Sequence, residues 1–134
     1  MFTSLKTSIS GLLVCLLSSC LFDSGSDRIV DDYEVVWIDV SSSRRLNKHE
    51  GLVPAYVFAA GHNSRFVFVK QYPLSQKTLN KIDKSRINYF IIERTDNKFQ
   101  DKPIYGPLNK IQFDSLCSVL DITYPRFDHT YPDL

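Results

Sequence analysis

The three histidines are the first residues to consider as chemical groups, because imidazole serves both as a metal ligand and as a general base. His49, His62 and His129 fall in a predicted loop, a predicted turn and a predicted tail. No two of them have the close spacing of a metal site. An enzyme would need a carboxylate such as Asp39 or Glu93 to converge with one of these histidines. The spacing therefore predicts no catalytic residue, no metal site and no cofactor.

The cysteines are the second set of candidates, and they differ in their surroundings. Cys15 lies in an apolar leader, and Cys117 shares the apolar face of a predicted helix with Leu116 and Leu120. A reactive thiol needs an electropositive and partly exposed setting, so Cys117 is predicted to be buried and inert. Cys20 is the cysteine with a predicted chemical role, and no intramolecular disulfide is expected.

Two charged runs are better interpreted as solvated surface than as binding sites. The acidic run 31–34 lacks the glycine that a calcium loop needs, and it leads directly into a strand. The basic run contains Lys77, Lys81, Lys84 and Arg86. That run could also contact lipid headgroups or anionic glycans. The whole chain has 16 basic and 15 acidic residues, a balance that argues against nucleic-acid binding.

The first twenty residues have the pattern of an export signal. Lys6 supplies a positive charge, and residues 9–17 form an apolar stretch far below the ~20 residues that a membrane-spanning helix needs. This pattern is typical of a cleaved secretory signal. The segment ends in Leu17-Ser18-Ser19-Cys20, which resembles the lipobox of bacterial lipoproteins. The weaker alternatives are an ordinary signal peptide with a chance cysteine and an uncleaved N-terminal helix.

The lipobox resemblance implies a membrane anchor. It implies cleavage between Ser19 and Cys20, diacylglycerol on the Cys20 thiol and often a further acyl chain, such as palmitate, on the new amino group. Two or three acyl chains hold a protein stably, whereas one holds it only marginally. We therefore expect the protein to be located in the cell envelope. Leu21 is not aspartate, which favours the periplasmic side of the outer membrane if the organism is Gram-negative.

The residues from Tyr33 onward are rich in β-branched and aromatic types, which predicts strands. The predicted strands cover residues 33–40, 55–60, 65–72, 89–94 and, shortened by Pro103, 99–105. The polar run 41–50 is predicted as a loop, and 61–64 as the turn of an antiparallel hairpin. Phenylalanine and valine alternate over 66–69, so that strand should be central and covered on both faces.

One helix is well signalled at its N-terminus. Asn109 can cap it, Gln112 completes a capping box, and Leu108 and Phe113 occupy the staple positions. A weaker helix is predicted after Ser75, within residues 73–86. The tail from Thr123 is predicted to be extended because its Tyr-Pro pairs disfavour helix.

Together these elements predict an α+β fold: a small antiparallel sheet of four to five strands with a C-terminal helix packed on it. The expected organisation is a signal peptide over 1–19, the lipidated cysteine and a flexible tether over 20–32, a globular domain over 33–122 and an extended tail over 123–134.

The middle of the chain also resembles a family of small, uncharacterised bacterial envelope proteins. The resemblance rests on Val69-Lys70-Gln71-Tyr72-Pro73, on the aromatic strand 89–93, and on Ile104-Tyr105-Gly106-Pro107-Leu108-Asn109 followed by Phe113. It spans roughly residues 33–122 and implies the architecture alone, with no activity. The Tyr-Gly-Pro-Leu segment is interpreted as a structural joint before the last helix.

Several functions remain open at this point. The favoured one is a non-catalytic binding domain, with membrane contact through Cys20 and a protein or cell-wall partner. The alternatives are an envelope enzyme, an immunity protein against an envelope-acting toxin, and a structural spacer. Aromatic residues with polar tips are enriched at interfaces. The chain offers Tyr33, Trp37, Tyr56, Tyr72, Tyr89, Tyr105, Tyr124 and Tyr131, of which about half should close the core.

Overall fold

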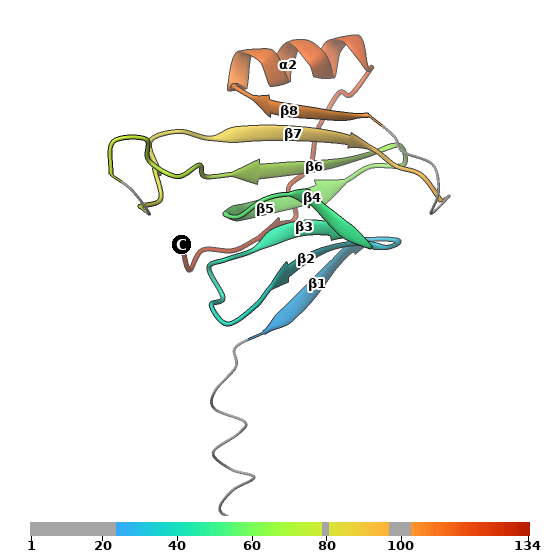
Figure 1. Cartoon of the computed structure of the whole chain (residues 1–134). Coiled ribbons are helices and arrows are strands. Elements are labelled where there is room, and N and C mark those ends of the chain that lie inside the picture. Colours follow the sequence, from blue (N-terminus) through green and yellow to red (C-terminus); the bar gives the residue numbers. More distant parts are fainter. Residues whose placement is uncertain (1–23, 79–80, 97–102) are drawn as a thin grey trace, which may run out of the picture.

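The described residues fold as two antiparallel β-sheets and one helix, stacked in three layers (Figure 1). A computed structural model describes residues 24–78, 81–96 and 103–134. The α+β class is confirmed, and most of the structure is β. The sequence predicted one sheet of four to five strands, whereas the structure has two. Five strands form the sheet that carries the helix, and four strands, including the one predicted over residues 33–40, form a second sheet on its other face.

Of the four-stranded sheet, the sequence predicted only β2, as the strand expected over residues 33–40; the other three strands were not predicted. Its strands are β1 (Gly25–Val30), β2 (Tyr33–Trp37), β3 (Arg45–Lys48) and β4 (Glu50–Val53), in the order β1-β2-β3-β4. The structure thus corrects the prediction of a flexible tether for residues 25–30 and of a loop for residues 45–50. Strands β1, β3 and β4 each bury one apolar side chain fully, and most of their other residues are polar. Their sequences therefore lack the apolar pattern by which a strand is predicted.

The five-stranded sheet has the order β8-β7-β6-β5-β9. Its strands are β5 (Val57–His62), β6 (Phe66–Gln71), β7 (Asn88–Glu93), β8 (Ile104–Leu108) and β9 (His129–Thr130). The predicted hairpin is confirmed as β5–β6, with a turn at 63–65 that starts two residues later than expected. The Asn63 side chain closes this turn by accepting bonds from the backbone N–H groups of Arg65 and Phe66.

Strand β6 separates two apolar cores, as the alternation predicted. Val67 and Val69 face the four-stranded sheet, where they pack with residues such as Tyr33 and Leu46. Phe66 and Phe68 face the helix, and their core contains Phe66, Phe68, Tyr89, Ile91, Phe113, Cys117 and Ile122. Burial on both faces makes β6 and its neighbour β7 the centre of the molecule.

Helix α2 (Lys110–Val119) begins as predicted. The Asn109 side chain accepts a bond from the Gln112 N–H at 2.8 Å, and the Gln112 side chain accepts one from the Asn109 N–H at 2.9 Å. This capping box satisfies donors that a helix start leaves open. Phe113 and Cys117 are the buried residues of the helix. No described helix is long and apolar enough to cross a membrane.

The weaker helix predicted within 73–86 is wrong for the residues described there, 73–78 and 81–86. The Ser75 hydroxyl does accept bonds from the N–H groups of Lys77 and Thr78, as a cap would. Residues 73–78 and 81–86 contain no helix, and Leu74 and Ile82 pair in an isolated antiparallel bridge instead.

The Tyr-Gly-Pro-Leu segment lies in β8 and not in a turn between elements. The register between β7 and β8 shifts there, because Tyr89 pairs with Leu108 whereas Ile91 pairs with Tyr105. Gly106 has φ +148°, and a Cβ on it would lie 2.9 Å from Cγ of the Phe90 ring. Glycine is therefore required for both conformation and close packing at this bulge.

Candidate functional site

A groove on the helix side of the five-stranded sheet combines aromatic walls with one partly buried cation. It encloses about 310 Å³ between β5, β6 and the C-terminal tail. Its lining residues are Phe58, Ala59, Lys70, Tyr72, Phe127, Thr130, Tyr131, Pro132 and Leu134. Aromatic and aliphatic groups with one cation thus form this recess, a composition common to ligand sites.

Lys70 is placed in the groove by the pleat of β6. It continues the row of Phe66 and Phe68 on the helix-facing side of the sheet. Its strand neighbours are Ala59 on β5 and Tyr89 on β7. The sheet therefore holds a lysine where an apolar side chain would be expected.

Aromatic rings surround the Lys70 ammonium. Its Nζ lies 4.4 Å from the ring centroid of Phe127 and 5.7 Å from that of Tyr89, within cation–π range. Beside it, the rings of Phe58 and Tyr72 stack with centroids 3.9 Å apart. The groove thus offers flat apolar surfaces around a cation.

The charge of Lys70 is not neutralised by another described residue, since no described carboxylate lies within 4.0 Å of its ammonium. Burial lowers the pKa of Lys70, and the nearby Lys110 ammonium lowers it further. Lys110 differs, because its 2.7 Å contact with Asp114 raises its pKa. A desolvated ammonium without a carboxylate is suited to receive an anionic group.

The C-terminal tail forms one wall of the groove, and polar contacts hold it there. Its strand β9 pairs with β5, and the Tyr131 N–H donates to the Phe58 carbonyl at 2.9 Å. The Asp27 carboxylate accepts a bond from the Tyr131 hydroxyl at 2.6 Å and contacts His129 Nδ1 at 2.8 Å. The tail is therefore a built part of the domain and not the separate extended segment that the sequence predicted.

Arg44 fixes the end of the tail. It is 8% exposed, donates to Asp133 at 2.6 Å, and lies between the rings of Trp37 and Tyr131 at 5.0 and 4.6 Å. The planar guanidinium suits this position because it stacks on rings while its edge binds a carboxylate. Arg44 thereby connects Trp37 of the four-stranded sheet to Tyr131 and Asp133 of the tail that borders the groove.

The three histidines are separated in the structure. His49 contacts Asp32 at 3.2 Å, His62 contacts the Asn63 carbonyl at 3.3 Å, and His129 contacts Asp27. Within 24–78, 81–96 and 103–134, no three His, Cys, Asp or Glu residues gather as metal ligands.

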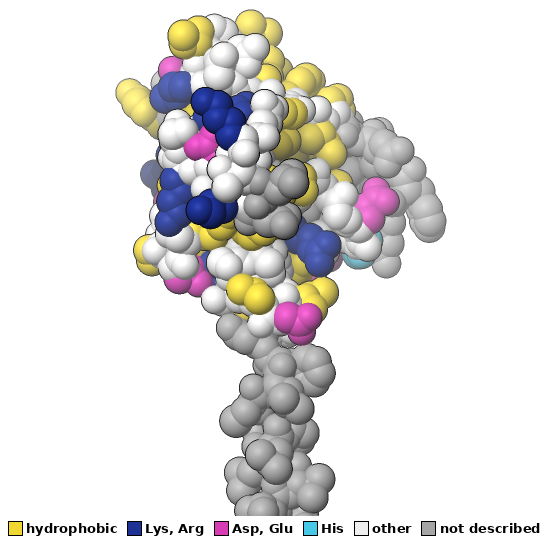
Figure 2. Space-filling model, turned by 60° about the vertical axis from the view of Figure 1, so that its left-hand side comes forward, with side chains coloured by type: hydrophobic (Ala, Val, Ile, Leu, Met, Phe, Trp, Pro, Cys, Tyr) yellow, Lys and Arg dark blue, Asp and Glu magenta, His cyan; other side chains and the backbone are white. Residues whose placement is uncertain are grey.

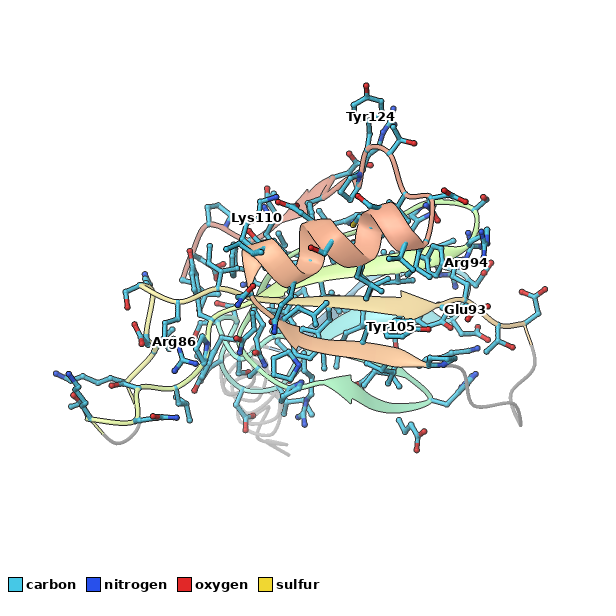
Figure 3. The ribbon with its side chains drawn as sticks, turned by 90° about the horizontal axis from the view of Figure 1, so that it is seen from above. Arg86, Glu93, Arg94, Tyr105, Lys110 and Tyr124 are labelled. Carbon is cyan, nitrogen blue, oxygen red and sulfur yellow. The ribbon has the colours of Figure 1, made fainter. Side chains whose placement is uncertain are left out.

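The two carboxylates considered with the histidines also lie apart. Tyr33, at the start of β2, donates to the Glu93 carbonyl. Asp39 follows the opposite end of β2, where its N–H donates to Ser24 Oγ at 3.3 Å. Six strand residues span about 20 Å, so the two acids border different ends of the domain. Figure 3 shows Glu93 at the end of β7 that lies away from Lys110.

Cys117 is buried on the inner face of α2, 6% exposed. Burial raises the pKa of its thiol, and the Asp114 carboxylate raises it further. Both effects disfavour the reactive thiolate. The prediction that Cys117 belongs to the core is therefore confirmed.

The acidic run 31–34 does not project freely. Asp31 forms an ion pair with Arg94 at 2.7 Å, and Tyr33 is fully buried. The basic run Lys77, Lys81, Lys84 and Arg86 lies on the β6–β7 loop, where Figure 2 shows a group of blue side chains. Arg86 stands on this loop beyond the sheet (Figure 3). The loop borders a hollow of about 550 Å³ that is open to solvent and has few apolar walls.

Sequence reasoning did not select Lys70 or the tail residue Phe127. The sequence did contain a signal for Lys70. This residue shares one face with Phe66 and Phe68 on a strand predicted to be covered on both sides, so a lysine is unusual at this position. No local signal could have shown Phe127 beside it, since the tail reaches the groove through contacts with β1 and β5. The lipobox residues Leu17, Ser18, Ser19 and Cys20 lie outside the described residues.

Comparison with known proteins adds a family. A family model described as "Protein of unknown function (DUF3997)" matches residues 28–125, well over half of the chain. The chain belongs to this family. The DUF3997 match contains the whole span 33–122 of the expected resemblance, starts within β1 and includes every element from β2 to α2. No curated protein and no solved structure matched the chain.

Proposed function

We propose that this DUF3997 protein is a bacterial envelope lipoprotein, anchored by lipid on Cys20, whose domain binds a partner without catalysis. The lipobox-like segment Leu17–Cys20 supports the anchor. Strand β1 begins at Gly25, five residues after Cys20, so a lipid on Cys20 would hold the domain close to a membrane. In a Gram-negative organism, the position after Cys20 favours the periplasmic face of the outer membrane.

The observation that supports a binding role is the Lys70 ammonium, which is partly desolvated among aromatic rings and has no described carboxylate partner. Such a charge costs stability in the free protein. A partner that supplies a carboxylate would offset that cost, while its apolar neighbours would pack on Phe127 and the Phe58–Tyr72 pair. We therefore propose a ligand with a carboxylate next to apolar groups, from a protein or a wall peptide.

The anchor is tested by metabolic labelling with radioactive palmitate. Wild-type cells should label the protein, whereas Cys20→Ser should abolish the label and leave a longer, uncleaved chain. Cys117→Ser serves as the matched control and should label normally, because that thiol is buried. Equal labelling of the wild type and Cys20→Ser would refute the anchor.

The groove is tested by photo-crosslinking of the full-length protein in cells. A benzophenone amino acid replaces Thr130, which lines the groove, or Val119, which is exposed on α2 as a control. We expect a defined adduct from position 130 alone, lost with Lys70→Gln and retained with Lys70→Arg, which keeps the charge. Lys84→Gln removes a charge outside the groove and should change nothing. An adduct at position 130 that survives Lys70→Gln would refute recognition through this lysine.

A further inference from the structure

The loop between β2 and β3 exposes two aliphatic side chains at one end of the domain. Ile38 and Val40 are each 56% exposed, with Asp39 between them. Isolated apolar residues on a surface are ordinary. This pair differs because of its position and because of how the loop backbone is bonded.

The loop lies where the described chain begins. The Asp39 N–H donates to Ser24 Oγ at 3.3 Å, which places the loop beside that residue. Four residues of chain reach at most about 14 Å. Cys20 therefore lies within roughly that distance of Ser24. Figure 1 shows this end of the domain opposite α2, and Figure 2 shows hydrophobic side chains there. A bilayer that holds lipid on Cys20 would therefore lie next to Ile38 and Val40.

The loop pairs the backbone carbonyls of its two aliphatic residues internally. The Ile38 carbonyl accepts bonds from the Val40 N–H at 2.8 Å and the Ser43 hydroxyl at 3.2 Å. The Val40 carbonyl accepts from the Ser43 N–H at 3.0 Å and from its hydroxyl at 2.6 Å. Backbone groups that are already paired cost less to move toward an apolar phase. The loop can thus present its side chains to lipid without unfolding.

The charges around the loop indicate an apolar contact and not an electrostatic one. Residues 38–43 contain no lysine or arginine. The first cation after the loop, Arg44, is buried and paired with Asp133, which also accepts a bond from Ser41 at 2.9 Å. The next one, Arg45, is exposed but belongs to β3, where it pairs with Val36. Asp39 limits how deeply the loop can enter a bilayer, because its carboxylate must stay among the lipid headgroups.

We propose that the Ile38–Val40 loop is a second membrane contact, which enters the lipid interface beside the anchor and fixes the orientation of the domain. The proposal rests on the proposed lipid anchor. Two aliphatic side chains bind a bilayer weakly, but the tether at Cys20 keeps them at high local concentration. In this orientation α2 points away from the membrane, and the contact depends little on lipid charge.

The test measures how deeply the loop lies in the lipid. An environment-sensitive fluorescent amino acid replaces Val40 or, as a control, Val119, which is 77% exposed on α2 at the opposite end. The chain from Cys20 onward contains every described residue. It is coupled through the Cys20 thiol to maleimide lipid in phosphatidylcholine vesicles, while the buried Cys117 stays unreacted.

Brominated phosphatidylcholine should quench the reporter at position 40 at least threefold more than the one at position 119, and aqueous iodide should show the reverse order. Ile38→Asp should reduce lipid quenching at position 40 to the level at 119, whereas Ile111→Asp on α2 should leave it unchanged. Replacing a fifth of the lipid with phosphatidylglycerol should have little effect. Equal quenching at the two positions would overturn the proposal.

The chemical tether separates the two proposals. Mass spectrometry of the protein purified from its membrane reports whether Cys20 carries lipid, independently of the loop. An unmodified Cys20 together with strong lipid quenching at position 40 would refute the anchor and keep the loop contact. A lipidated Cys20 with equal quenching at positions 40 and 119 would support the anchor and refute the loop contact.

Discussion

Lys70 is the residue at which stability and binding oppose each other. Its ammonium is partly desolvated, and burial followed by the nearby Lys110 lowers its pKa below the ordinary 10.5. The unfolded chain then holds this proton more tightly than the folded one, so Lys70 lowers stability wherever it is charged. Stability should rise with pH as the pH approaches 10.5 from below.

Lys70→Met should therefore stabilise the domain at pH 7, because methionine keeps the length of the stem and removes the charge. We expect a rise in Tm on the order of 1–4 °C, the scale of a few tenths of a kcal/mol in a domain of this size. The variant should also lack the alkaline rise in stability. Thermal unfolding between pH 7 and 10.5, with Lys84→Met as the exposed control, measures both. A lower Tm for Lys70→Met would contradict a desolvated charge.

Asp27 has the opposite role, since it stabilises the tail that borders the groove. Burial acts to raise the pKa of Asp27, but bonds from Tyr131 and His129 outweigh it, and the pKa falls below its ordinary 3.8. The same contact and burial raise the pKa of Tyr131. The carboxylate thus contributes fully above pH 3.8, and its contribution is lost as the pH falls through the lowered value.

Asp27→Asn should lower the free energy of unfolding at pH 7 by about 1 kcal/mol, a figure reduced for the solvent exposure of the carboxylate. Asp128→Asn, next to His129 and exposed, should change it by less than about 0.5 kcal/mol. Urea titrations at pH 7 and at pH 3 measure the difference, which should shrink at the lower pH. A difference that persists unchanged at pH 3 would mean that the charge is not its source.

At the scale of elements, the sequence predicted the strands and the helix that carry strong local signals, and missed the short strands that bury few side chains. β6, β7 and the α2 start were predictable because apolar runs and a capping box are local signals. β3 and β4 were not, since Leu46 and Val53 are their only fully buried residues. β9 was not predictable either, because two residues become a strand only through pairing with β5. The groove includes one predicted and one unpredicted element, since its floor is the predicted strand β6 and one wall is the tail, whose pairing with β5 was not predicted.

The docking of the tail on β5 depends on the absence of a side chain at Gly61. A Cβ there would collide with the Arg126 carbonyl and lie 2.7 Å from its carbon, and backbone cannot move aside as a flexible side chain can. Gly61→Ala should lower the free energy of unfolding by about 1–3 kcal/mol, as overpacking does, and should weaken crosslinking from Thr130.

Gly51→Ala is the matched control for this prediction. A Cβ at Gly51 meets only the Asn47 side chain, at 3.8 Å. Its effect should stay within about 0.5 kcal/mol, as for other surface changes. Urea denaturation of both variants measures the contrast, and equal effects would show that the tail does not pack closely on Gly61.

At the scale of the whole molecule, the two sheets share one core, so the domain must begin before Tyr33. Strand β1 pairs with β2 from Gly25 to Val30, and its Ile29 is buried between the sheets. Through Asp27, β1 also holds the tail that closes the groove on the other sheet. Residues 25–30, predicted as part of a tether, therefore belong to the folded core.

This arrangement predicts how truncation affects folding. A chain that starts at Ser24 keeps every pair of the β1–β2 ladder and should unfold cooperatively, as should one that starts at Cys20. A chain that starts at Tyr33 loses the β1 ladder, the burial of Ile29 and the Asp27 contacts with the tail. Burial of one isoleucine alone is worth about 1.5–3 kcal/mol, and ordinary domains have only about 5–15 kcal/mol in total. The shortened chain should therefore lose most of its stability. Amide NMR dispersion and thermal unfolding of the three chains measure this, and a chain from Tyr33 as stable as the longer two would show that β1 is only a tether.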